Sequence, residues 1–363
     1  MPTVNEILQD AAIGHAIDLQ HLSNAKVNEL VSLLNSEDPN IRAEILVAIE
    51  QMDGEDYSDE YMAAILALLL LRIKTVYVQI TFALKQLASD LAVYELKYQR
   101  NLFQGALPAE LNTPGYLTSP VQQGVIDSVL GKPYQGRTIE SWVSSLEASR
   151  AAKIRDGIRS GVADGLSAPE IVKAIAGTKA EGYADGALNR DRIELSTIVA
   201  TVAGGAAQVV AEAFAKSNDK LIRCLVWISV LDSRTSAECR LRSQRLYKDN
   251  EEHTPIGHNI PWLAGPGRLH HRCRSMFAAV VRSWSSLGLS ADTSDATKAA
   301  LDGAVPNEIT YSQWLSRQPA SVQDKVLGPV RGKLLRAGKV KIGEFVNDKG
   351  RLLTLDELNA RIK

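Results

Sequence analysis

A stretch without proline or glycine, from Tyr57 to Leu102, constrains the fold of this chain most strongly. Nothing in it interrupts main-chain hydrogen bonding along a helix, so its apolar pattern predicts one long helix or two in succession. Upstream, apolar residues recur at steps of three and four, the period of an amphipathic helix. These residues are Val27, Leu30, Leu33, Leu34, Ile41, Ile45 and Ile49. We therefore expect residues 1–102 to form an N-terminal helical region.

Prolines change the character of the chain after this region. Residues 103–139 contain Pro108, Pro114, Pro120 and Pro133 with interspersed glycines. Proline lacks an amide proton and glycine adds conformational freedom, so this composition disfavours regular structure. We expect an extended linker or arm.

Helical character resumes at about Glu140. Between Gly165 and Glu170 a helix stop is followed by a capping box, in which Ser167 caps the next helix and Glu170 reaches back to it. A later helix, at about 195–216, has a Gly-Gly-Ala-Ala centre that would let a neighbouring helix approach closely. A nucleotide-binding glycine loop is discarded because the chain has neither G-x-G-x-x-G nor a P-loop.

The periodicity changes near residue 221. Arg223–Ser229 and Met276–Val281 favour β-strands, and Arg245–Tyr247 is expected to add a short third strand. A loop rich in proline, glycine and histidine, His253–Gly267, lies between them. These features predict a small sheet with a long irregular insertion, and we take residues 140–282 as one core.

The C-terminal part is expected to be helical again after a polar linker at 283–307. Helices are predicted over Tyr311–Gln318 and Ala320–Arg336, with Gly338 ending the second. A capping box at Thr354–Glu357 predicts a final short helix. Residues 308–363 thus form a C-terminal helical module, and the whole chain is predicted to be α+β and predominantly α-helical.

Composition limits the classes of protein that remain. The formal net charge is -1 and apolar residues make up 45%, so the chain is neither a polycation nor generally disordered. Three cysteines cannot form a dense disulfide framework, which favours a reducing compartment. The N-terminus lacks the features of a secretory signal, and the apolar run Met62–Leu71 is about half of a membrane span. We expect a soluble protein without a membrane-spanning segment.

Charge is distributed unevenly along the chain. Residues 1–65 hold thirteen acidic side chains against Lys26 and Arg42, whereas residues 221–290 hold ten basic side chains against five acidic ones. The default explanation of this uneven charge is that the charged residues lie on solvent-exposed faces of the protein. The alternative is a chain whose two ends meet differently charged partners.

Two thiols and an imidazole suggest a metal site. His270 and Cys273 are three residues apart and Cys239 lies upstream, so the three can serve as ligands of one structural zinc ion. Asp232 or His258 is the proposed fourth ligand, with His253 and His271 as further possibilities. The alternative is two buried cysteines and a hydrogen-bonded histidine.

Catalysis is the other use of such residues. A Cys–His catalytic pair has no orienting partner visible in the sequence, and a zinc deaminase would need H-x-E and P-C-x-x-C, which do not occur. We therefore expect no catalytic residue.

Arginines flank the same region. Five are candidates for contacts with DNA or phosphate: Arg240, Arg242, Arg245, Arg268 and Arg272. Aromatic residues among them are few, essentially Tyr247 and Trp262, so stacking on bases has little support. Pairing with local carboxylates is the default alternative.

The spacing of these residues resembles a known family. The pattern W-x-x-x-x-D-x-R-T-x-x-x-C, followed by a strand and H-x-x-C-R, is similar to that of the phage Mu protein F-like head-morphogenesis family. The matching residues are Trp227, Asp232, Arg234, Thr235, Cys239, Tyr247, Pro266, His270, Cys273 and Arg274. Where the family has a last cysteine this chain has Ser275, and Cys224 is the only remaining thiol that could replace it.

A second block, in the tail, resembles a module of phage minor head proteins. Its matching residues are Tyr311, Trp314, Leu315, Gln318, Pro319, Gln323, Leu327, Gly328, Arg331, Leu335, Gly338, Phe345 and the Leu-Thr-Leu-Asp-Glu-Leu end. Together the two blocks extend over roughly residues 150–360. The first 140 residues are only generically similar.

The resemblance implies a minor capsid protein present in few copies per virion. Such a protein associates with the portal protein, the major capsid protein or both, contacts packaged double-stranded DNA, and acts in head assembly, DNA packaging or genome ejection. It would be found in the phage head near the portal vertex, and in the host cytoplasm during assembly. It would be structural and not an enzyme.

The rival interpretation is a phage-encoded effector or enzyme, a nuclease or nucleotide-modifying protein, that carries a head-morphogenesis module. Residues 283–363 contain no histidine or cysteine, which disfavours an appended catalytic domain. A head-maturation peptidase is a third possibility, but the H-E-x-x-H motif is absent.

Overall fold

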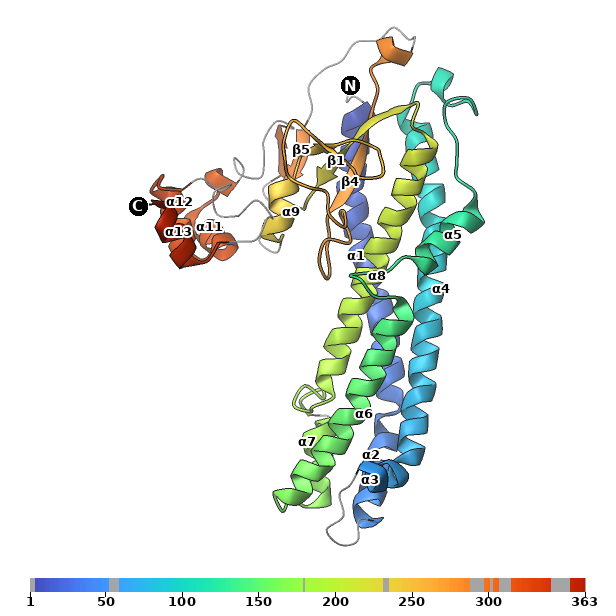
Figure 1. The fold of residues 1–363 in the computed structure, drawn as a ribbon, viewed down its shortest axis with the longest axis vertical. Helices are drawn as coiled ribbons and strands as arrows, with labels where there is room; N and C mark the ends of the chain where they lie inside the picture. Colours follow the sequence, from blue (N-terminus) through green and yellow to red (C-terminus); the bar gives the residue numbers. More distant parts are fainter. Residues whose placement is uncertain are drawn as a thin grey trace. The chain divides into compact units, whose positions relative to one another are not determined.

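A computed structural model describes residues 4–51, 59–178, 180–230, 235–287, 297–300, 303–306, 315–340 and 353–362. Long helices and a small antiparallel sheet make up most of these residues, which confirms the predicted, predominantly helical α+β fold (Figure 1). The chain divides into two compact units, each built from separate stretches. Unit 1 comprises residues 1–20, 91–129 and 204–363, and unit 2 comprises residues 21–90 and 130–203.

The N-terminal helical region has the predicted character. Its helices are α1 (Val4–Ser36), α2 (Asp38–Gln51), α3 (Asp59–Ile65) and α4 (Ala67–Ala106). The run without proline or glycine therefore forms two successive helices, one of the two predicted alternatives. Tyr57 and Ser58, at its start, lie outside the described residues.

In unit 2, α6 (Ile139–Ala163) packs closely against α7 (Ala168–Ala176). A Cβ atom at Gly161 would lie 2.4 Å from the side chain of Ile171, so only glycine allows this approach. The predicted capping box starts α7: the Glu170 carboxylate accepts hydrogen bonds from the amide (2.8 Å) and hydroxyl of Ser167. Local sequence signals therefore set both the start of α7 and its packing.

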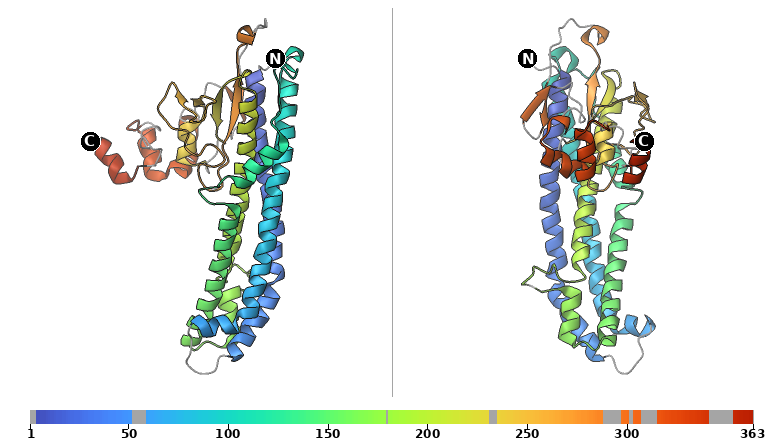
Figure 2. Two further views of the ribbon diagram at one scale, coloured as in Figure 1. Left: turned by 45° about the vertical axis from the view of Figure 1, so that its right-hand side comes forward. Right: turned by 90° about the vertical axis from the view of Figure 1, so that its left-hand side faces the viewer.

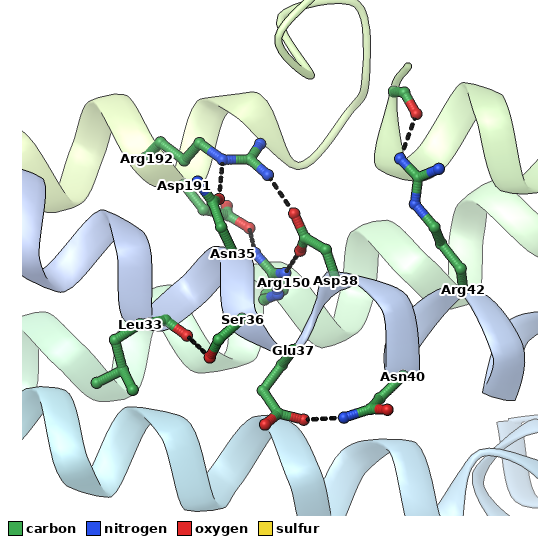
Figure 3. Close-up of polar contacts among 11 residues, drawn as sticks. Leu33, Asn35, Ser36, Glu37, Asp38, Asn40, Arg42, Arg150, Asp191 and Arg192 are labelled. Carbon is green, nitrogen blue, oxygen red and sulfur yellow. Dashed lines mark hydrogen bonds and ion pairs between the residues drawn. The ribbon is translucent and has the colours of Figure 1, made fainter. Parts of the chain in front are cut away.

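A buried network of charges joins the helices of unit 2 (Figure 3). Arg150 of α6, only 1% exposed, donates to Asp38 (3.0 Å) and to Asp191 (3.4 Å) at the start of α8 (Asn189–Ser217). Arg192 donates to the other oxygen of Asp38 at 2.6 Å, and Lys153 also pairs with Asp191. Because each buried charge has a partner, losing one carboxylate would leave a buried cation uncompensated.

Unit 1 contains the sheet, in the order β3-β2-β1-β4 with antiparallel pairing. The strands are β1 (Ile222–Ile228), β2 (Leu246–Tyr247), β3 (Pro255–Ile256) and β4 (Met276–Val281), and a short helix, α9 (Ala237–Arg242), lies between β1 and β2. The three predicted strands are present, and β3 is additional. The views in Figure 2 agree in placing β1 and β4 beside the first turns of α1 and the last turns of α8.

The sheet and these helix ends share one apolar core. Leu8 of α1, Phe103 of α4 and Phe214 of α8 pack in the same buried cluster as Leu225 and Trp227 of β1. The core explains why β1 is a nearly continuous apolar run, since six of its seven residues are buried.

Residues 103–139 are not extended throughout, contrary to prediction. They include the last turn of α4, a single 3-10 turn at Ala109–Leu111, and a helix, α5 (Gln122–Gly131). Val125 and Val129 of α5 are buried. The prolines lie outside α5, so they set its limits without preventing it.

The C-terminal part differs from prediction at two places. The polar segment 283–307 contains a 3-10 turn (Trp284–Leu287) and a hairpin of β5 (Thr297–Ala300) and β6 (Gly303–Pro306). The helix expected over Ala320–Arg336 is broken into α11 (Ala320–Leu327) and α12 (Pro329–Arg336).

The break has a local cause. Gly328 adopts a left-handed φ of 82°, and proline at the next position starts a helix but cannot continue one. Gly338 (φ 67°) ends α12 as predicted. Gln323 of α11 donates to the carbonyl oxygens of Leu315 (3.1 Å) and Gln318 (2.9 Å), which fixes the start of this module.

The final helix, α13 (Leu355–Ile362), begins at the predicted capping box. The Glu357 carboxylate accepts from the Thr354 amide at 2.7 Å, and the Thr354 hydroxyl accepts from the Glu357 amide at 3.2 Å. Of the helix expected over Tyr311–Gln318, residues 311–314 lie outside the described residues.

Two helices, α4 and α8, are long and apolar enough to cross a membrane by length and composition alone. The apolar window of α8 is 78% buried, as in a core helix, whereas that of α4 is 33% buried. The comparison with a membrane span in the sequence analysis used only the apolar run Met62–Leu71. It left out the apolar residues that follow Lys74.

In unit 2 the exposed side of α4 has an apolar seam. It consists of Leu68 (65% exposed), Leu71 (61%), Val78 (60%) and Phe82 (70%), with exposed Thr75 between them. Successive members are three or four residues apart, which is the spacing of a coiled-coil interface. Leu71 also lines a groove between α4 and α6, together with Lys74 and Ala148.

Candidate metal centre

The predicted Cys239, His270 and Cys273 come together in unit 1. Cys239 lies in α9, His270 in the loop before β4, and Cys273 three residues ahead of β4. The Sγ atoms of the two cysteines are 3.6 Å apart, and Nε2 of His270 is 3.2 Å from Sγ of Cys239. All three ligand atoms lie within 4.8 Å of one another, so they can hold one metal ion.

The start of α9 places Cys239. Ser236 caps the helix, and its hydroxyl accepts the amide proton of Cys239 at 3.2 Å. The same hydroxyl is 2.8 Å from Nε2 of His270. One serine therefore orients both a thiol and the imidazole.

Main-chain contacts fix the ring of His270. Its Nδ1 donates to the carbonyl oxygen of His271 at 2.9 Å, which turns Nε2 toward the thiols. The amide of Cys273 donates to the carbonyl of His270 at 3.1 Å and closes a tight turn. A histidine held at one nitrogen by a carbonyl is the usual arrangement of a metal-binding imidazole.

A serine bridge ties the group to β1. The hydroxyl of Ser229 accepts from the Trp227 indole (3.1 Å) and donates to the carbonyl oxygen of Cys239 (2.8 Å). It also lies 3.2 Å from the hydroxyl of Ser275. The Trp227 ring packs edge-on against Trp262 at 5.2 Å, so an aromatic wall borders the group.

The close approach predicted at residues 204–207 is to this loop. A Cβ atom at Gly204 would lie 3.2 Å from the carbonyl oxygen of Cys273, and one at Gly267 would lie 2.6 Å from the carbonyl oxygen of Gly204. The expectation of a neighbouring helix at Gly204 is therefore wrong. The small residue is needed because the loop before β4 crosses α8 at this point.

The protonation of the group is uneven. A hydrogen bond from Cys239 and another from His270 hold the pKa of Cys273 well below its ordinary value. The bond to Cys273, together with burial, raises the pKa of Cys239. The bond to Cys273 also raises the pKa of His270.

Among the described residues, the proposed fourth ligand His258 is not in this group. His258 donates from Nε2 to the carbonyl oxygen of Leu246 (2.9 Å) and accepts at Nδ1 from the amide of Ile260 (3.2 Å). Both of its nitrogens are therefore engaged elsewhere, and its proposal as fourth ligand is not supported. Cys224 is buried in β1 and is not among the three grouped residues, so it does not replace the family cysteine.

Several residues of the predicted motif have structural contacts. Asp232 and Arg234 lie outside the described residues. Thr235, two residues before α9, donates from its hydroxyl to the carbonyl oxygen of Val230. The Tyr247 ring packs against Trp262 at 4.9 Å.

Two of the five arginines are committed inside the protein. Arg242 is fully buried and donates to the carbonyl oxygens of Glu238 and Pro261, both at 2.9 Å. Arg268 pairs with Glu212 of α8. Contacts of these two side chains with DNA are therefore not supported, and the default of local pairing holds for them.

The remaining arginines are nearer the surface. Arg245 and Arg272 are exposed, and Arg240 and the motif residue Arg274 are half-buried. The positions of these four arginines do not test whether they contact DNA. Fewer than the five predicted arginines therefore contribute positive charge to the surface around the candidate metal centre.

The group can bind a metal or undergo thiol chemistry. A catalytic cysteine needs room for a substrate at sulfur, yet Cys239 is only 2% exposed and Cys273 only 4%. Sequence reasoning missed Ser229 and Ser236, and it named Ser275 without its hydrogen-bonding role; the hydroxyls of all three organise the group. Only the N-cap position of Ser236 was signalled locally, by its place ahead of a short helix.

Comparison of the chain with protein-family models, with curated proteins and with solved structures found no match.

Proposed function

We propose that this protein is a bacteriophage minor head protein that binds the portal protein during head assembly, DNA packaging or genome ejection. The motif from Trp227 to Arg274 and the tail module resemble that family, and the exposed apolar seam of α4 carries the proposal. Exposed apolar surface with coiled-coil spacing costs free energy in water and favours burial by a partner helix.

The partner is proposed to bind at the seam. Leu71→Glu with Phe82→Glu places charges on a surface that must become dry, so binding to the portal should weaken at least tenfold. Both side chains are more than 60% exposed, so the fold should tolerate the change. The measurement is co-purification with the portal protein of the encoding phage.

Val121→Glu is the matched control, because Val121 is 79% exposed and is not a member of the seam, whose residues belong to unit 2. It should bind like the wild type. Equal binding by the seam variant would exclude the seam as the portal-binding surface.

We further propose that Cys239, His270 and Cys273 bind one structural zinc ion. In a tetrahedral zinc site two thiolate sulfurs are about 3.8 Å apart and a sulfur and an imidazole nitrogen about 3.5 Å. The corresponding distances of 3.6 and 3.2 Å fit this donor set. Zinc would fasten α9 to the loop before β4, and a water molecule would complete the coordination.

Metal content tests the zinc proposal. Purified protein should contain about one zinc per chain, and Cys273→Ser should lose it, because a hydroxyl is a poor replacement for a thiolate. Cys224→Ser removes the buried cysteine outside the group and should keep the metal. Metal-free wild-type protein with undiminished stability would reject the site.

The rival function is an enzyme or effector. The contact between Sγ of Cys239 and Nε2 of His270, at 3.2 Å, favours catalysis by a thiol. It predicts a Cys239-dependent turnover that does not depend on any capsid partner. Burial of both thiols makes this the weaker proposal.

A further inference from the structure

The thiols of Cys239 and Cys273 are arranged for a second chemistry. Their sulfur atoms lie 3.6 Å apart and are already in contact. A disulfide bond is about 2.05 Å long, so the sulfurs need to close by about 1.5 Å. Rotation about the side-chain bonds of two cysteines can supply a movement of this size without moving either main chain far.

We propose that Cys239 and Cys273 form a reversible disulfide when the site holds no metal, so that the same pair of sulfurs is either a metal ligand set or a redox-sensitive crosslink. The disulfide stands on the geometry of the thiols alone. The claim that bound zinc prevents the disulfide rests on the proposed zinc site. The disulfide and its prevention by zinc can therefore be refuted separately.

Selectivity follows from the positions of the three cysteines. Cys224 lies in β1, is fully buried, and is not in the group formed by Cys239, His270 and Cys273. Intramolecular pairing is thus restricted to one pair among the three possible ones. Burial of both partners also disfavours crosslinks between two protein chains.

The environment favours closure over further oxidation of one sulfur. A sulfur oxidised at Cys273 meets a second thiol at contact distance, before another oxidant molecule can arrive. Cys273 is 4% exposed and Cys239 2%, and the residues that precede Cys273, His271 and Arg272, are exposed.

The reaction balances with hydrogen peroxide as the oxidant. The thiolate of one cysteine attacks a peroxide oxygen, the O–O bond breaks, and a sulfenic acid and water form. The second thiol then attacks the sulfenic sulfur, and the S–O bond breaks with release of water. In total two thiols lose two protons and two electrons, and one peroxide becomes two water molecules.

The crosslink would replace one connection by another. Zinc ties α9 to the loop before β4 through three side chains, whereas the disulfide ties the same two segments through Cys239 and Cys273 and frees His270. Oxidised sulfur has no thiolate to offer, so the disulfide form cannot bind zinc through these residues. The segment containing β2 and β3 lies between Cys239 and Cys273, so its two ends stay joined in the zinc-bound form and in the disulfide form.

The test uses the full-length wild-type chain. One sample is stripped of metal with a chelator, one is loaded with zinc, and both are treated with hydrogen peroxide. Peptide mapping under non-reducing conditions should find the Cys239–Cys273 disulfide in the stripped sample, and its reduction by dithiothreitol should restore both thiols. Circular dichroism checks that the stripped chain is folded, and Cys224→Ser serves as the control that must still form the crosslink.

Zinc should slow the reaction at least tenfold, and a zinc-sensitive dye should detect one zinc released per disulfide formed. A disulfide whose formation rate zinc does not change would refute the exclusion but keep the crosslink. Sulfinic acid at Cys273 with a free Cys239, or a disulfide that includes Cys224, would overturn the crosslink itself. Stoichiometric zinc binding without a disulfide would leave the metal proposal intact, so the two failures are distinguishable.

Discussion

Single side chains decide the chemistry of the candidate metal centre. The hydroxyl oxygen of Ser275 lies 3.2 Å from that of Ser229. The Ser275 hydroxyl also lowers the pKa of Cys239, against the larger opposite effects of Cys273 and burial. A serine at this place therefore organises the thiols through hydrogen bonds, where a cysteine would bind metal directly.

Tyr247 illustrates how burial controls stability at one residue. Burial raises the pKa of Tyr247 to about 12. A neutral tyrosine with a raised pKa in the folded state adds stability that is fully present below its ordinary pKa of 10. This contribution is lost as the pH rises from 10 toward 12, so the free energy of unfolding should fall over that interval.

Replacement by phenylalanine tests this account. Among the described residues the Tyr247 hydroxyl is buried without a hydrogen-bond partner, so Tyr247→Phe should raise stability at pH 7 by about 1 kcal/mol. The alkaline loss should also become smaller in denaturant titrations between pH 9 and 12. Tyr116→Phe, at a site 38% exposed, should leave stability at pH 7 unchanged. A destabilised Tyr247→Phe would show that the hydroxyl is satisfied.

At the scale of elements, glycines set which segments can cross. At Gly204 of α8 the carbonyl oxygen of Cys273 occupies the space of a side chain, at 3.2 Å from the Cβ position. Gly204→Leu should therefore push the loop from α8, lower stability by about 1–3 kcal/mol and weaken zinc binding.

Gly14→Ala provides the control for this substitution. Gly14 lies in α1, and nothing is within 4 Å of its Cβ position. Alanine favours a helix over glycine by about 1 kcal/mol, so this variant should be more stable and bind zinc normally. Thermal unfolding and zinc content measure both variants. Normal zinc binding by Gly204→Leu would contradict the close approach.

The sequence predicts elements better than their contacts. The capping boxes at Ser167 and Thr354 are local signals, because the interacting groups are three residues apart. The fate of Arg242 is not local: its burial depends on the carbonyl of Pro261, nineteen residues away. His258 likewise satisfied the composition of a metal site but is placed by the strand at Leu246.

The break between α11 and α12 has a local signal in the sequence. The Gly328–Pro329 pair predicts an end and a new start within the C-terminal helix, as the structure has it. The helix α5 within the proline-containing stretch is a different case, since it depends on the burial of Val125 and Val129, which the surrounding prolines do not signal.

At the scale of the whole molecule, four of the described helices contribute residues to both compact units. Residues of α1, α4, α5 and α8 lie on either side of the divisions at residues 20, 90, 129 and 203. Helical periodicity cannot reveal such a division, because it reports which side of a helix is buried and not by what. The sequence boundaries at 102, 139 and 282 therefore do not coincide with the units.

The proposed role combines a charged, buried interior with an exposed apolar surface. The Arg150 network joins helices of unit 2, while the seam of α4 in that unit is exposed. Stable helices that present an apolar seam suit a protein whose work is assembly.

Quantitative mass spectrometry of purified phage particles, after chemical crosslinking, tests the central claim most directly. A minor head protein should be present in every preparation at low copy relative to the major capsid protein, with crosslinks from Lys74 or Lys85 of α4 to the portal. Particles that lack the protein, at a detection limit below one copy per virion, would contradict the assignment.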